Sequence, residues 1–197
     1  IRKETIHLYD KSLEAILHAM NLHRHDVCSD AEVEQVVKRS NKPIPVNIDE
    51  VYQKDIKNLY GEILNYASMT QSNMDQVAQN RIYDLKLTAR YIIEMVKDIR
   101  ELQKNLNHFR KSHNTFIIEE YNDLRAHLMT VLRSIQKIRD SEDGPEEIMT
   151  VLEVQKTESA NNEVRMNSTI DTLIREHKID SNMASSLIND IGFTHSI

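Results

Sequence analysis

Two pairs of carboxylates, each four residues apart on a predicted helix, are the first candidates for chemistry. Glu94 with Asp98 and Glu119 with Asp123 both follow the pattern acid-x-x-x-Asp. Because residues i and i+4 lie on one face of a helix, either pair could hold a hard metal ion directly or through water. The same spacing is equally typical of a solvated face with ion pairs to basic neighbours. Since it recurs in this chain at close to chance frequency, spacing alone favours the solvated interpretation.

Histidines form the second candidate group. Four of them fall in the first predicted helix, which covers residues 3–25: His7, His18, His23 and His25. Glu14 lies one turn before His18. Carboxylate-bridged di-iron bundles need Glu-x-x-His on two helices. The only match here runs from Glu4 to His7, so we exclude an oxidase of that class and interpret the histidines as surface or interface residues.

The composition excludes further classes of function. The chain of 197 residues has three glycines, and it contains no phosphate-binding glycine loop, no Gly-x-Ser-x-Gly and no His-Glu-x-x-His, so we expect no enzyme. A net charge of −6 and the absence of Trp argue against nucleic-acid binding. A single cysteine, Cys28, cannot form an internal disulfide. The apolar runs are only a few residues long, which argues against insertion of this chain into a membrane.

The helix that must position Glu94 and Asp98 spans residues 80–110, which contain neither Gly nor Pro. Its apolar seam recurs at steps of four and three, with one polar member: Ile82, Leu85, Ala89, Ile92, Val96, Ile99, Gln103, Leu106 and Phe109. A helix of this length cannot bury such a stripe alone, so other helices must cover it. Glu94 and Asp98 lie on the side away from the seam.

The rest of the chain is predicted to be helical as well. Besides 3–25, we expect helices over 31–39, 50–72, 116–140, 146–177 and 180–189. The helix over 116–140 has its own seam: Ile117, Tyr121, Leu124, Leu128, Val131, Ile135 and Ile138. Two prolines make 41–47 a linker, and short breaks are expected at 73–75, 112–114 and 141–145. The stretch 155–163 has one apolar residue, so we expect it to be exposed, frayed or kinked. The fold class is an all-α antiparallel bundle.

Several segments resemble a known family. LHAMNLHR (17–24), YGEILNYAS (60–68), KDIRELQKNL (97–106), EEYNDLRAHL (119–128) and LIREHKIDSNMASSLIND (173–190) are similar to the C-terminal soluble region of bacterial sodium/phosphate cotransporter-family proteins, which is PhoU-like. The resemblance spans nearly the whole chain. It implies two packed three-helix bundles in tandem, here 1–111, including the linker 41–47, and 112–197.

The resemblance also implies a metal site. PhoU proteins carry acidic motifs of the form Glu/Asp-x-x-x-Asp that bind metal clusters on the bundle surface, and Glu94 to Asp98 matches that form. The corresponding stretch of the last helix runs from Ser186 to Asp190, where serine replaces the first acid. The implied ligands are therefore Glu94, Asp98 and Asp190, and the implied cofactor is a divalent or iron-type metal ion.

The function implied by the resemblance is that of a regulatory domain on the cytoplasmic face of the bacterial inner membrane. Its partner would be the transporter membrane domain preceding Ile1 in the same chain, whose phosphate uptake or export it would modulate, with a homodimer as a further assembly. Two alternatives remain open from the residues. One is a free-standing PhoU-like regulator of phosphate signalling, and the other is a structural or dimerising helical module.

Overall fold

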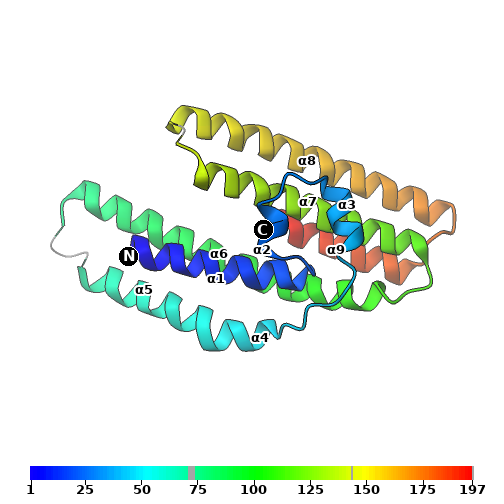
Figure 1. Cartoon of the computed structure of the whole chain (residues 1–197), viewed down its shortest axis with the longest axis horizontal. Helices are drawn as coiled ribbons and strands as arrows, with labels where there is room; N and C mark the ends of the chain where they lie inside the picture. The colour runs from blue at the N-terminus through cyan, green and yellow to red at the C-terminus, as the bar shows by residue number, and fades with distance from the viewer. Residues whose placement is uncertain (71–73, 143, 197) are drawn as a thin grey trace.

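The computed structural model describes residues 1–70, 74–142 and 144–196, and all regular secondary structure in these ranges is helical (Figure 1). The helical segments are α1 Arg2–Ala19, α2 Arg24–Val27, α3 Val33–Arg39, α4 Ile48–Val51, the π-helical turn η1 Tyr52–Ile56, α5 Lys57–Thr70, α6 Gln76–Phe109, α7 Thr115–Asp140, α8 Pro145–Arg175 and α9 Ser181–Ser196. The all-α prediction is confirmed.

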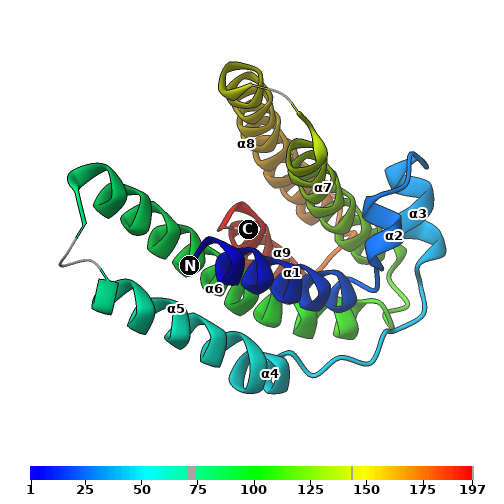
Figure 2. The ribbon, with the colours of Figure 1, turned by 60° about the vertical axis from the view of Figure 1, so that its left-hand side comes forward.

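Helix α6 is the centre of the arrangement. It packs against α1 and α5 on one side and against α9 on another, while α7 packs against α8, α9 and α3. The buried apolar side chains of both groups form one continuous core. Figure 2 shows α7 and α8 rising away from α1 and α6 at one end, with α9 between them at the base. The predicted boundary at residues 111–112 falls in the turn between α6 and α7.

The seam predicted for α6 is confirmed along most of its length. Its buried positions include Ile82, Ala89, Ile92, Val96, Ile99, Leu106 and Phe109. Helix α6 also buries Ile93 and Leu102, which the single stripe leaves out, because neighbouring helices cover it from more than one side. Leu85 and Gln103 are only half-buried.

The seam predicted for α7 is confirmed only in its first half. Ile117, Tyr121, Leu124 and Leu128 are buried. Val131, Ile135 and Ile138 are half-buried instead, and the buried side of the helix shifts to Met129, Leu132 and Gln136. The shift accompanies the divergence of α7 from α1 and α6 in Figure 2, which leaves the original stripe without a helix against it.

Some predicted boundaries are wrong for local reasons. The first helix ends at Ala19 rather than residue 25, because Asn21 adopts the left-handed conformation with φ 59°, which asparagine tolerates better than most residues. The helical stretch expected over 50–72 begins at Ile48, because the Asn47 side chain caps it by accepting a hydrogen bond from the Glu50 amide. The stretch 155–163 is largely exposed, as expected, and it lies inside the continuous helix Pro145–Arg175.

The remaining predicted breaks fall partly outside the described residues, which exclude Asn73 and Asp143. Asp75 and Asn114 act as N-caps, their side chains accepting hydrogen bonds from the backbone amides that follow. The last helix extends to Ser196 rather than residue 189.

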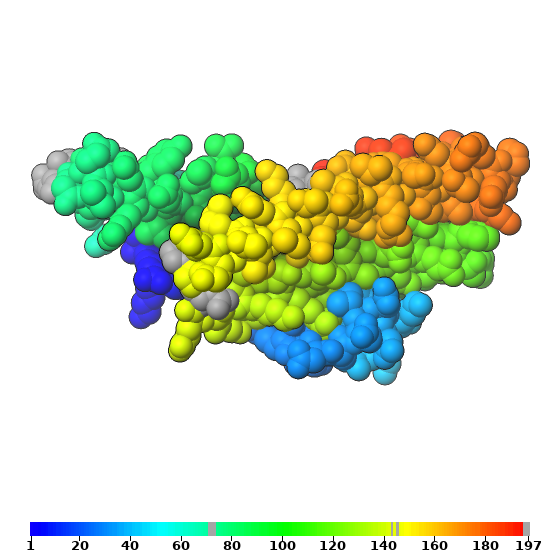
Figure 3. Space-filling view, turned by 90° about the horizontal axis from the view of Figure 1, so that it is seen from above, coloured from blue at the N-terminus to red at the C-terminus, as the bar shows by residue number. Residues whose placement is uncertain are grey.

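Two arginines of α7 anchor the segment that joins α1 to α4. Arg125 is 2 % exposed and donates to the carbonyl oxygens of Met20 (2.8 Å), Val37 (3.1 Å) and Ser40 (2.8 Å). Burial lowers the pKa of Arg125 to about 10, and the negative ends of the helix dipoles of α1 and α3 favour its charge. Arg133 likewise donates hydrogen bonds to the backbone carbonyl oxygens of Asp26 and Ala31. Figure 3 shows α2 and α3 lying against α7.

Candidate functional site

The predicted acidic pair lies on the partly exposed side of α6. The Glu94 carboxylate accepts a hydrogen bond from Arg90 Nε at 2.9 Å, and its side chain is 42 % exposed. This hydrogen bond raises the pKa of Arg90 above its usual value. Asp98, one turn further on, is half-buried. An ion pair to the preceding turn is what the solvated interpretation predicts.

Asp190, the third predicted ligand, lies in the core. Its side chain is fully buried between α6 and α7. Tyr121 Oη donates to one carboxylate oxygen at 2.6 Å, and Asn105 Nδ2 lies 3.0 and 3.2 Å from the two oxygens. Burial raises the pKa of Asp190 to about 6, against the opposing effect of these hydrogen bonds. The carboxylate therefore joins three helices through a buried polar network.

The structure does not bring Asp190 to the acidic pair. Asp190 is level with Asn105, which lies seven residues beyond Asp98 and so about 10 Å further along the helix axis. Within residues 1–70, 74–142 and 144–196, no three His, Cys, Asp or Glu side chains form a group that could hold a metal ion. Metal binding by Glu94 and Asp98 stays a prediction.

The second acidic pair is divided between two environments. Glu119 is exposed, whereas Asp123 lies 3.6 Å from Arg165 of α8 in an ion pair. Asp123 and His127 face a polar hollow of about 390 Å³ formed with α3 and α8. Their neighbour Glu120 is buried, and burial together with the charge of Asp123 raises its pKa to about 7.

Three of the four histidines predicted to be surface residues lie around the turn after α1, whereas the exposed His7 lies within α1. His18 and His23 meet edge to face with ring centroids 5.6 Å apart, and His23 stacks on His25 at 5.4 Å. These three histidines and Glu14 line one hollow, whose volume is about 290 Å³. His23 and His25 are exposed and His18 is half-buried, in agreement with the prediction.

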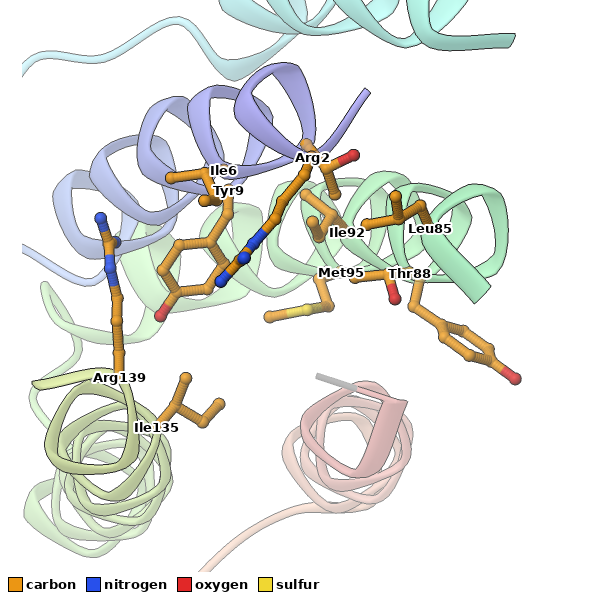
Figure 4. A pocket seen from close by; sticks show the side chains of 11 residues that line it. Arg2, Ile6, Tyr9, Leu85, Thr88, Ile92, Met95, Ile135 and Arg139 are labelled. Carbon is orange, nitrogen blue, oxygen red and sulfur yellow. The ribbon is translucent and has the colours of Figure 1, made fainter. Parts of the chain in front are cut away.

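A larger apolar groove lies where α7 diverges from α1 and α6, and no sequence motif predicted it. Its volume is about 520 Å³, within the usual range of small-molecule sites. Figure 4 shows the side chains that line it. The apolar walls come from three helices: Ile6 of α1, Leu85, Tyr91, Ile92 and Met95 of α6, and Ile135 of α7. Leu85 belongs to the predicted seam of α6 and Ile135 to that of α7. At this groove no other described helix packs fully over either side chain, and both are only half-buried.

Three side chains with polar groups, Tyr9, Arg139 and Arg2, determine the charge and hydrogen-bonding capacity of the groove. The Tyr9 hydroxyl is a buried atom with no hydrogen-bond partner, and burial raises the pKa of Tyr9 above its usual value. The guanidinium of Arg139 lies over the Tyr9 ring, with Cζ 5.5 Å from its centroid, and pairs with Asp10. Arg2 points into the groove from α1 (Figure 4). Its guanidinium has no ion-pair partner among the described residues.

Comparison with known proteins adds no relative. No family model matches the chain, and searches of curated proteins and of solved structures find no match. None of the described helices combines the length and the apolar character that a membrane crossing requires.

Proposed function

We propose that this chain is a PhoU-like regulatory domain that binds the membrane part of a sodium-dependent phosphate transporter at the cytoplasmic face of the bacterial inner membrane and modulates phosphate movement. The sequence resemblance over residues 17–190 supports the choice of partner. The helical architecture is compatible with it, since α1, α5 and α6 pack together and so do α7, α8 and α9.

The observation that carries a protein-binding role is the apolar surface at the start of α8. Four apolar side chains within residues 149–154 are between 42 % and 55 % exposed: Met149, Val151, Leu152 and Val154. Figure 3 shows this part of α8 on the outside of the molecule. Because residues three apart share a helix face, Met149 with Leu152 and Val151 with Val154 form two exposed apolar pairs on opposite sides of α8. Such exposed apolar pairs are typical of a surface that another protein covers, because leaving them in water costs free energy.

Regulation requires more than contact. A domain changes a transporter's conformational equilibrium only if it binds two transporter states with different free energies. The long, uninterrupted α8 offers a rigid edge that could bind one state of a partner and lose part of its contact in another. The domain would then act by stabilising the state that covers residues 149–154.

The experiment is phosphate uptake by proteoliposomes containing a bacterial sodium/phosphate transporter membrane domain, measured with and without this chain. We expect the chain to bind the membrane domain and to change the uptake rate severalfold. Leu152→Ser with Met149→Ser should abolish both effects. Val164→Ser, a control at an exposed apolar position almost three turns beyond this surface, should retain them.

Two results would reject this function. One is the absence of any binding or change in uptake. The other is a dimer in light scattering that the Met149 and Leu152 substitutions disrupt, with no effect on transport. The second result would favour the dimerising helical module, because the apolar surface would then be covered by a second copy.

A further inference from the structure

We propose that the groove between α1, α6 and α7 binds an amphiphile consisting of an acyl chain and an anionic head group. Residues that the function proposed above does not use form this site. The groove lies on the inner side of the divergence between α7 and α6 (Figure 4), whereas the partner surface lies on α8. Binding here is independent of the transporter contact.

The apolar part of the site is an incomplete core. Leu85 and Ile135 belong to seams with buried members such as Ile92 and Leu128, yet both are only half-buried where they line the groove. Tyr91 is 55 % exposed on the same wall. An acyl chain in the groove would remove these surfaces from water and gain about 25 cal/mol for each Å² of apolar area buried. The open side of the groove allows the ligand to enter without unfolding.

The polar part of the site selects an anionic head group. Arg139 and Arg24 both pair with Asp10, and Asp140 is the second carboxylate that acts on Tyr9, so two cations and two carboxylates largely balance there. Of the two arginines that line the groove, Arg2 is the one without an ion-pair partner among the described residues, and it points into the groove (Figure 4). A carboxylate beside Arg2 would also accept a hydrogen bond from the Tyr9 hydroxyl, which is buried without a partner. Charge-assisted hydrogen bonds of this kind are stronger than neutral ones.

The test is calorimetric titration of the full chain with decanoate, with decanol and inorganic phosphate as partial ligands. We expect decanoate to bind, decanol to bind about tenfold more weakly, and phosphate not to bind in the same concentration range. Arg2→Gln should weaken decanoate binding about fivefold. Lys3→Gln, an exposed neighbour that does not line the groove, makes the same charge change and should have no effect.

Two further variants test the apolar wall. Tyr91→Asp and Ile135→Asp each place a carboxylate against the acyl chain and should abolish decanoate binding. Tyr91 is exposed, so its variant should fold even if a carboxylate at position 135 disturbs α7. Val164→Asp, outside the groove, is the control and should bind normally. Tyr9→Phe should weaken binding without lowering the melting temperature, because its hydroxyl has no partner in the free protein.

The source of the amphiphile is distinguished by flotation with phosphatidylglycerol vesicles. Decanoate binding without flotation indicates a free fatty acid, while flotation that Tyr91→Asp abolishes indicates the acyl chain of a bilayer lipid. The proposal is overturned if neither decanoate nor vesicles bind, or if Tyr91→Asp and Arg2→Gln bind as the wild type does. It is also overturned if light scattering shows a dimer that Tyr91→Asp dissociates, since a second copy would then cover the groove.

Discussion

The two ends of the α6–α7 pair differ in how far the apolar side chains of these helices are buried. At the end where the two helices are joined, α9 packs against both, and Leu102, Ile117 and Tyr121 are buried. At the other end α7 diverges, and Leu85 and Ile135 remain half-buried in an open groove. We call these the closed end and the open end. The comparison teaches that an apolar seam stabilises the fold only where another element covers it, and elsewhere it is available for binding.

Arg125→Met should have the largest effect on stability, because Arg125 ties the segment between α1 and α4 to the closed half of α7. The substitution leaves the carbonyls of Met20, Val37 and Ser40 without their donor. We expect the free energy of unfolding to fall by about 3–5 kcal/mol, as when one partner of a buried charged network is removed. Urea unfolding followed by circular dichroism measures it.

Arg165→Met is the matched control for that measurement. Arg165 is largely exposed and makes a single ion pair with Asp123 at 3.6 Å, so its loss should cost less than about 1 kcal/mol. If Arg125→Met costs no more than the control, water satisfies the three carbonyls and Arg125 is not an anchor.

Alanine at two leucines of one helix compares the two ends directly. Leu102 is fully buried at the closed end, whereas Leu85 lines the groove at the open end. Leu102→Ala should cost about 3 kcal/mol, because it removes buried surface and leaves a cavity, and Leu85→Ala about 1 kcal/mol. Equal losses in urea unfolding would mean that the groove is packed in solution, and the distinction between the ends would fail.

The parts of the fold that could be predicted from sequence are those that depend on local spacing. Ala89, Ile92 and Val96 follow the helical period, and their burial is confirmed. The break expected at 112–114 also has a local cause, because the Asn114 side chain accepts hydrogen bonds from the backbone amides of the next turn. These features need no knowledge of the neighbouring helices.

The parts that could not be predicted depend on residues far apart in the chain. Arg125 stands between leucines of a helix and would ordinarily be solvated, and its carbonyl partners are 85 to 105 residues away. Asp190 has the spacing of a surface motif with Ser186, yet α9 inserts it between α6 and α7. Likewise, the pattern at Ile135 is that of a core residue, and only the divergence of α7 leaves it open.

Asp190→Asn tests the polar network at the closed end through its pH dependence. Because burial raises the pKa of Asp190 from 3.8 to about 6, the native state binds its proton more tightly than the unfolded state does. Stability from this group is therefore full below about pH 4 and is lost as the pH rises through 6. The free energy that corresponds to this change in pKa is roughly 3 kcal/mol in total. Asparagine keeps an oxygen for the Tyr121 hydroxyl but cannot ionise.

We therefore expect Asp190→Asn to gain about 2 kcal/mol relative to the wild type when the pH is raised from 4.5 to 7. Urea unfolding at the two pH values measures this difference, in which the titrations shared by both proteins cancel. Parallel stability profiles would show that Asp190 titrates normally and that water reaches this part of the closed end.

Glu94→Ala with Asp98→Ala should have the smallest effect on the metal-free protein. Glu94 is paired with Arg90 but 42 % exposed, and such pairs contribute about 0.2–1 kcal/mol, so the double variant should lose less than about 1 kcal/mol. If the pair also binds metal, as the resemblance to PhoU implies, Mn²⁺ should raise the melting temperature of the wild type and not that of the variant.

Glu119→Ala with Asp123→Ala is the control, because it removes a pair of the same spacing from α7. A rise in melting temperature that survives the loss of Glu94 and Asp98 but not that of the control pair would move the metal site to α7, beside the polar hollow that Asp123 lines. A loss above about 2 kcal/mol in the metal-free Glu94/Asp98 variant would exceed what a partly solvated ion pair supplies. It would mean that the acidic face of α6 supports its packing against a neighbouring helix.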